Sequence, residues 1–347
     1  MERPGTSPDP EDWWGRYGHR VRPVDGPDPT APPPAGTGGE SASSAAELTD
    51  EPILRDEQRD EPASGWRRAV LRLSGGVVNP GPGPAERQHR ELLHRIRRPL
   101  LQTRHIAVAS MKGGVGKTTV ATLLGLVLAE SRGDRVIALD ANPDAGTLAD
   151  RLTGEATVTV RELVRDLDRI DSWAAVSHYT SLVGRLQVLA SEQDPAAAGG
   201  GLSRAEYDGV CALLERYFNI VVTDSGTGFL HPAGAGILGR AHSLVIVGAP
   251  TVDGAGRASR TLDWLLSNGL GALATDAVAV LSSARSSAEV NTARIREHFA
   301  TRCRAVVEIP HDPQLAVGGR VELARLQPAT RAAAFELTAL VADDFSS

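Results

Sequence analysis

The sequence predicts an α/β fold in which a mostly parallel sheet carries helices on both faces and follows a disordered, proline-rich tail. Three observations predict it. Short apolar runs alternate with stretches that carry apolar residues at helical spacing, as in βαβ units. Two of the runs end at an aspartate, at the carboxyl edge where open α/β sheets bind ligands. The first part of the chain is poor in aliphatic residues.

Residues 1–62 form the predicted tail. They are rich in proline, glycine, serine and acids, and they have too few aliphatic residues to bury a core. Trp13, Trp14 and Tyr17 interrupt this composition. The three aromatics form either a short docking element for a protein partner or an incidental cluster in a solvated tail.

Residues 63–103 form a predicted basic linker. The segment GWRRAVLRL at 65–73 precedes a proline-glycine stretch, and a basic helix is expected after it. Leu92, Leu93 and Ile96 make an apolar stripe on this helix that fits docking on the core. Its arginines form either a solvated face, which we favour, or a surface for the phosphates of lipid or DNA: Arg87, Arg90, Arg95, Arg97 and Arg98.

Residues 104–345 form the predicted α/β domain. Its strands are expected at 105–109, 136–139, 220–223, 244–247, 277–281 and 305–309. Helices are expected over 118–130 and around 256–267 and 289–299.

The two lysines of the chain stand in one short segment between the first strand and the first helix of this domain. Lys112 and Lys117 flank a glycine-rich turn, and every other long basic side chain is arginine. Lysine is retained where a compact ammonium is needed, as against a phosphate wrapped by backbone. Gly113, Gly114 and Gly116 let successive N–H groups point inward, and the following helix adds its positive end. The segment therefore predicts a phosphate-binding loop.

The standard G-x-x-x-x-G-K-[ST] motif would need glycine at position 111, where this chain has Met111. The segment instead resembles K-G-G-x-G-K-[ST], the deviant Walker A motif of the MinD/ParA ATPases. The resemblance implies a P-loop NTPase fold, ATP and Mg²⁺ as cofactors, and an ATP-dependent homodimer in which Lys112 reaches the nucleotide of the other subunit. It assigns nucleotide binding to Gly113, Gly114, Val115, Gly116, Lys117, Thr118, Thr119, Pro310 and Asp312.

The two aspartates at strand ends match further parts of this family's pattern. Asp140 fits the first acid of the first switch loop, and Asp224 resembles the Walker B acid, which implies that it holds Mg²⁺ through water while Thr118 supplies a hydroxyl. Asn142 stands where a second switch acid is usual, and Asp144 is an alternative. An amide orients water but cannot accept its proton. We therefore assign catalysis to Lys112, Lys117 and Asp140, and expect slow or partner-stimulated hydrolysis.

The adenine pocket follows the family pattern less closely. An asparagine often follows the strand at 277–281, whereas this chain has Ser282 and Ser283. The turn at 310–313 resembles the family's purine-flanking turn, in which His311 is expected to be a loop residue.

A second resemblance extends over most of the chain from about Gly65 onward. The order of acidic tail, WRRAV segment, N-P-G-P, basic helix, phosphate loop and D-A-N-P-D resembles the EspI-like ATPases associated with type VII (ESX) secretion. It implies a regulatory or accessory ATPase that acts on a partner machine.

Three other functions compete with this one. A ParA-like partitioning or positioning ATPase would bind DNA nonspecifically, although a net charge of −6 gives no general attraction to nucleic acid. A MinD-like membrane anchor is not expected, because the chain ends in an acidic segment. A metabolic enzyme on the same fold would need substrate-binding residues that we do not find.

Cys211 and Cys303 are too few for a disulfide framework, and no apolar run of about 18 residues or signal-peptide core occurs. A soluble, cytoplasmic protein is therefore expected.

Overall fold

The computed structural model describes residues 62, 65–110, 113–142, 146–154, 158–192, 201–226, 232–282 and 292–346. The chain divides into two compact units, Met1–Glu57 and Gln58–Ser347, and every described residue belongs to the second. The tail predicted over residues 1–62 lies outside the described residues except for Pro62, as do Lys112 and Asp144.

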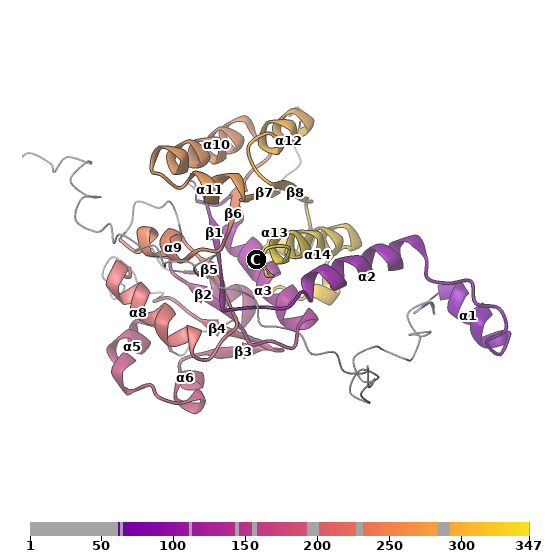
Figure 1. Cartoon of the computed structure of the whole chain (residues 1–347), viewed down its shortest axis with the longest axis horizontal. Coiled ribbons are helices and arrows are strands. Elements are labelled where there is room, and N and C mark those ends of the chain that lie inside the picture. Colours follow the sequence, from indigo (N-terminus) through magenta and orange to yellow (C-terminus); the bar gives the residue numbers. More distant parts are fainter. Residues whose placement is uncertain are drawn as a thin grey trace, which may run out of the picture. The chain divides into compact units, whose positions relative to one another are not determined.

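A single eight-stranded sheet organises the described domain (Figure 1). Its strands in chain order are β1 (Arg104–Ala109), β2 (Val136–Asp140), β3 (Ser181–Val183), β4 (Leu186–Leu189), β5 (Ile220–Asp224), β6 (Ser243–Gly248), β7 (Val278–Ser282) and β8 (Ala305–Ile309). The spatial order is β3-β4-β2-β5-β1-β6-β7-β8, and β3 with β4 is the antiparallel pair. The mostly parallel sheet predicted from the sequence is confirmed.

Alternate residues of the strands face two separate cores. In β1, Ile106 and Val108 belong to one hydrophobic cluster, and Ala107 and Ala109 belong to the other. Strands buried on both faces read as continuous apolar runs, as these do. Helices therefore cover both faces, as expected.

The helices divide between the two faces. One face is covered by α2 (Pro84–Ile96), α3 (Lys117–Ser131), α4 (Leu148–Leu152), α13 (Pro313–Val317), η4 (Leu323–Arg325) and α14 (Pro328–Ala342). The other is covered by α5 (Val160–Arg165), η3 (Leu167–Arg169), α6 (Trp173–His178), α8 (Arg204–Glu215), α9 (Gly234–Arg240), α10 (Val252–Ser267), α11 (Gly271–Thr275) and α12 (Thr292–Ala300). A further helix, α1 (Gly65–Leu73), precedes α2.

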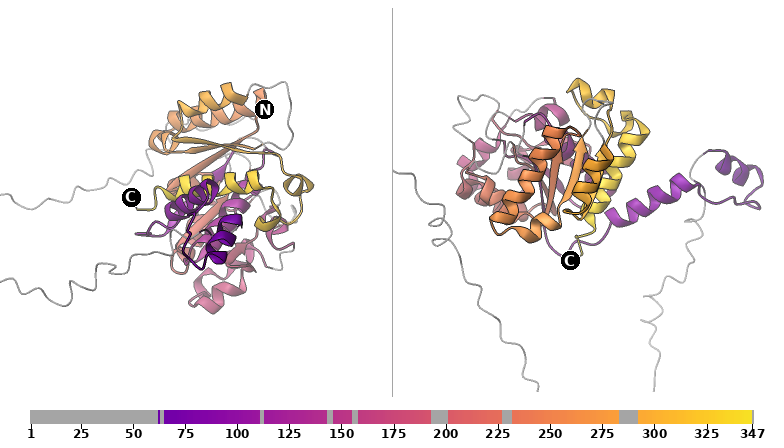
Figure 2. Two further views of the ribbon diagram at one scale, coloured as in Figure 1. Left: turned by 90° about the vertical axis from the view of Figure 1, so that its right-hand side faces the viewer. Right: turned by 90° about the horizontal axis from the view of Figure 1, so that it is seen from above.

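The linker helix α2 packs against the C-terminal helix α14 (Figure 2). Leu92 and Ile96 are buried in the core, so the predicted stripe does dock there. Arg95 and Arg98 form ion pairs with Asp343 at 2.6 and 3.0 Å. These two arginines thus hold α2 to the domain, instead of forming part of the purely solvated face that we favoured.

Candidate functional site

The phosphate-binding loop predicted from the sequence connects β1 to α3. Gly114 and Gly116 have φ values of 76° and 97°, which side-chain-bearing residues rarely adopt. A Cβ at Gly116 would also lie 2.7 Å from Ser282 Oγ. Helix α3 begins at Lys117 without a side-chain cap from the described residues, so its first amides and its dipole are available to an anion.

A cavity of about 660 Å³ lies beside this loop. Its lining residues are Gly113, Gly114, Gly116, Lys117, Thr118, Thr119, Asn142, Thr147, Arg151, Ser282, Ile309, Pro310, His311, Asp312, Leu315 and Ala316. Of the residues predicted to bind nucleotide, all but Val115 belong to this lining. The Val115 side chain is buried in the core.

Lys117 is buried beneath the loop, with 7% of its surface exposed. Burial lowers the pKa of its ammonium, and the nearby charge of Asp224 opposes that change. An ammonium held in such a place gains from an anionic ligand, because a buried charge is costly when it is not balanced. Lys112 lies outside the described residues, so its predicted role stays a prediction.

Thr118 and Asp224 form the pair that best fits a metal ion. The Thr118 hydroxyl donates to Asp224 Oδ2 at 2.5 Å. Asp224 Oδ1 is buried and has no hydrogen-bond partner within the described part of the chain. Burial raises the pKa of Asp224, whereas the Thr118 hydrogen bond and Lys117 lower it. A hydroxyl and an unused carboxylate oxygen beside a phosphate-binding loop are what Mg²⁺ needs, so these residues fit the predicted metal.

Asp140 lies beside Asp224 on the neighbouring strand, where the two residues pair in register. Burial and the charge of Asp224 raise the pKa of Asp140 to about 7. Its Oδ1 and Oδ2 accept backbone N–H groups from Asn142 and Leu148, both at 3.1 Å. Asp140 does not line the cavity, but Asn142 does. In this conformation Asp140 therefore holds the loop after β2, and Asn142 is the residue of that pair that lines the cavity.

The turn after β8 forms another wall of the cavity. Pro310, His311 and Asp312 all line it. The buried carboxylate of Asp312 accepts the backbone N–H groups of Gln314 at 2.9 Å and Gln327 at 2.8 Å. Asp312 therefore caps α13 and fixes the turn, so its own oxygens are engaged by backbone.

Sequence reasoning did not identify Thr147 and Arg151 as lining residues. Both follow the loop after β2, and α4 is only five residues long, too short to show helical periodicity. Their position just beyond the loop after β2 was the one available signal. Ser283, considered for the adenine side, lies outside the described residues.

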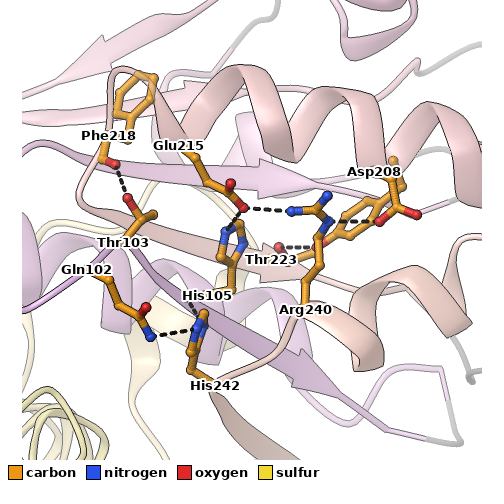
Figure 3. Close-up of polar contacts among 10 residues, drawn as sticks. Gln102, Thr103, His105, Asp208, Glu215, Phe218, Thr223, Arg240 and His242 are labelled. Atoms are coloured by element: carbon orange, nitrogen blue, oxygen red, sulfur yellow. Dashed lines mark hydrogen bonds and ion pairs between the residues drawn. The ribbon is translucent and has the colours of Figure 1, made fainter. Parts of the chain in front are cut away.

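A second polar cluster lies at the opposite end of β1 (Figure 3). His105 Nε2 contacts Glu215 Oε1 at 2.9 Å, and Arg240 bridges Glu215 and Asp208 at 2.7 Å each. The backbone N–H of His105 donates to Nδ1 of His242 at 3.1 Å. This network joins α8 and α9 to the start of β1, away from the phosphate-binding loop.

Comparison with known protein families and curated proteins identifies related chains. The CobQ/CobB/MinD/ParA nucleotide-binding domain matches residues 106–314. The ESX-1 secretion-associated protein EspI of Mycobacterium tuberculosis is 34% identical over 291 residues, which cover 81% of this chain and 42% of EspI. The chain thus spans less than half the length of that relative. The chromosome partitioning protein ParA of Caulobacter vibrioides is 39% identical over 82 residues, 20% of this chain and 30% of ParA.

Solved structures share the fold. A ParA family ATPase from Chlorobium tepidum aligns with a TM-score of 0.59 and 17% identity, covering 68% of this chain and 98% of that one. The septum site-determining protein MinD of Pyrococcus horikoshii, complexed with Mg-ADP, aligns with a TM-score of 0.55 and 20% identity, covering 68% and 95%. Over the residues that the structure describes, no helix combines the length and apolarity needed to span a membrane.

Proposed function

The chain belongs to the CobQ/CobB/MinD/ParA nucleotide-binding family, and from this premise we propose that it is an ATP-dependent switch that dimerises with ATP and hydrolyses it slowly. The observation that carries the proposal is the Thr118–Asp224 hydrogen bond, which sits beside a glycine loop of phosphate-binding geometry and leaves one buried carboxylate oxygen unused.

Each part of the cavity has a task under this proposal. The amides of the glycine loop and Lys117 bind the phosphates. Thr118, together with Asp224 through water, would hold Mg²⁺, which would supply positive charge beside the phosphates. The turn at 310–313 flanks the purine. Lys112, from the other subunit of the dimer, adds a further cation.

Slow hydrolysis follows from the chemistry of Asn142. Its amide orients a water molecule but does not accept the proton. Among the described lining residues the one carboxylate is Asp312, and its oxygens are engaged by backbone N–H groups. The described lining therefore offers no further carboxylate to accept the proton, and we propose that a partner protein stimulates turnover.

The similarity to EspI supports a role near a secretion machine. We propose that the nucleotide state of this chain controls its association with a component of type VII secretion, and that a protein partner binds through the segment that precedes α1. The alternative is a DNA-positioning ATPase, which the shorter match to ParA favours. Retention on DNA that requires ATP and falls with salt would support this alternative.

Light scattering after size exclusion tests the switch directly. The protein is measured without nucleotide, with Mg-ADP and with Mg-ATP, while phosphate release is followed in parallel. We expect a dimer with Mg-ATP alone and turnover well below about 10 s⁻¹, the median for enzymes. A monomer in all three conditions would refute the switch, and unstimulated turnover near that median would refute slow hydrolysis.

A further inference from the structure

We propose that Arg151 is a second cation of the nucleotide site and that it contacts the phosphate groups from α4. This inference rests on the proposed function, because it assigns a new residue to the same cavity.

The position of Arg151 follows from the packing of α4. This helix packs against α3, the helix that carries Lys117 and Thr118. Arg151 lines the cavity together with those two residues. Its Nη1 donates to the carbonyl of Leu315 in α13 at 3.1 Å. The guanidinium thus lies between α4 and α13, at the wall of the cavity that the glycine loop also lines.

The charge of Arg151 has no anion to balance it within the described part of the chain. None of the ion pairs formed by described residues includes it. Burial lowers its pKa, and no neighbouring charge acts on it strongly enough to offset that change. A partly buried cation without an anion costs free energy that an anionic ligand recovers.

The remaining donors of the guanidinium suit a phosphate. The group carries five N–H donors in a planar fork, and one of them is used by Leu315. Bidentate recognition of phosphate oxygens is the geometry that this fork fits best. Asp312 is the one carboxylate among the described lining residues, and none of the ion pairs formed by described residues joins it to Arg151.

The backbone around Arg151 is fixed independently of its side chain. The carbonyl of Arg151 accepts the N–H of Val321 at 2.9 Å. Arg320 Nε donates to the carbonyl of Leu152 at 3.2 Å, so Arg320 bridges the same two segments without lining the cavity. Arg320→Gln is therefore a matched control that removes an arginine from this bridge but not from the site.

Isothermal titration calorimetry of the full chain tests the proposal, with Mg-ADP and with tripolyphosphate as ligands. We expect Arg151→Gln to weaken the binding of both by about 10- to 100-fold, the range of one hydrogen bond to a charged group. Arg151→Lys should recover part of this loss, and Arg320→Gln should leave both affinities within about twofold of the unmodified protein. Thermal unfolding without ligand checks that all variants are folded.

Three results would overturn the proposal. Unchanged affinity in Arg151→Gln would exclude a contact with the ligand, and a loss for Mg-ADP but not for tripolyphosphate would place the contact on the base or ribose. A loss of equal size in Arg320→Gln would mean that the bridge, not the charge, matters. If the unmodified protein and Lys117→Ala both fail to bind Mg-ADP, the proposed function itself fails and this inference falls with it.

Discussion

At the scale of single residues, Gly146 shows how closely the loop after β2 fits around Asp140. Its N–H donates to Ser191 Oγ at 2.9 Å. A Cβ at this position would lie 1.9 Å from Asp140 Oδ2 and 2.0 Å from Ser191 Oγ. The Asp140 carboxylate is not free to shift, because it is buried and accepts the backbone N–H groups of Asn142 and Leu148.

We therefore expect Gly146→Ala to lower the free energy of unfolding by about 1–3 kcal/mol, the usual range for forcing extra atoms into a packed site. Chemical denaturation without nucleotide measures the change. Gly133→Ala is the control, because a Cβ at Gly133 meets no atom within 4 Å. Equal effects of the two substitutions would contradict the steric argument.

His105 provides a test of pH dependence. Burial lowers the pKa of its imidazole; Glu215 opposes this effect, and His242 and Arg240 add to it. Because the folded-state pKa lies below the ordinary value of about 6.5, protons bind more tightly to the unfolded chain. The stability that neutral His105 contributes is therefore fully present above the ordinary pKa of about 6.5. It is lost as the pH falls through the folded-state pKa.

We expect the free energy of unfolding of the unmodified protein to fall from pH 7 to pH 5. In His105→Gln, the slope of this free energy against pH should be shallower by up to about 1.4 kcal/mol per pH unit. Urea denaturation at three pH values measures the slopes. His94→Gln, which changes an exposed histidine, should keep the original slope. An unchanged slope in His105→Gln would show that another group governs this range.

Family resemblance and strand patterns together predicted part of the site from the sequence. Thr118 and Asp224 are 106 positions apart; the resemblance implied that both hold the metal, and the strand pattern placed Asp224 at the carboxyl edge of the sheet. The hydrogen bonds that turn Asp140 toward its own loop were not predictable, because they depend on the path of that loop. Arg151 was missed because α4, with five residues, is too short to show helical periodicity.

At the scale of secondary-structure elements, the pairing of α2 with α14 shows which contacts periodicity can predict. The stripe of Leu92, Leu93 and Ile96 predicted that the helix docks, since apolar residues at helical spacing need a partner surface. Its ionic partner was not predictable, because Arg95 and Asp343 are 248 positions apart. The hairpin of β3 and β4 was missed because both strands are short; Gly184, with φ of 60°, was its turn signal.

We expect Ile96→Ala to destabilise the domain by about 2–5 kcal/mol, because the Ile96 side chain is fully buried and its loss leaves a cavity. Leu101→Ala is the matched control, since Leu101 lies a few residues further along and is 74% exposed. Thermal or urea unfolding distinguishes the two. Equal stabilities would mean that α2 contributes little to the fold.

At the scale of the whole molecule, the strand order explains why the site forms where it does. β1 lies between β5 and β6 in the sheet. The carboxyl ends of β1, β2 and β5 therefore bring the glycine loop, Asp140 and Asp224 to one edge. The fold class and this grouping were predictable from alternating patterns and strand ends. The proposed dimer involves two chains, so its test compares substitutions of Lys112 and of Lys117.

We expect Lys117→Ala to abolish nucleotide binding and Lys112→Ala to retain binding but weaken the ATP-dependent dimer. The reason is that Lys117 lines the cavity of its own chain, whereas Lys112 is proposed to reach the other subunit. Calorimetry with Mg-ADP and light scattering with Mg-ATP separate the two effects. Normal dimerisation of Lys112→Ala would refute the proposed role of Lys112.

Because α2 packs on α14, we expect the smallest fragment that folds to include both helices. The family match covers residues 106–314. Helix α14 follows the match and packs on α3, and helix α2 precedes the match and packs on α14. A fragment cut to the family boundaries would lose both helices and leave apolar surface of α3 open to water. The packed unit that these contacts define is therefore longer at both ends than the family match.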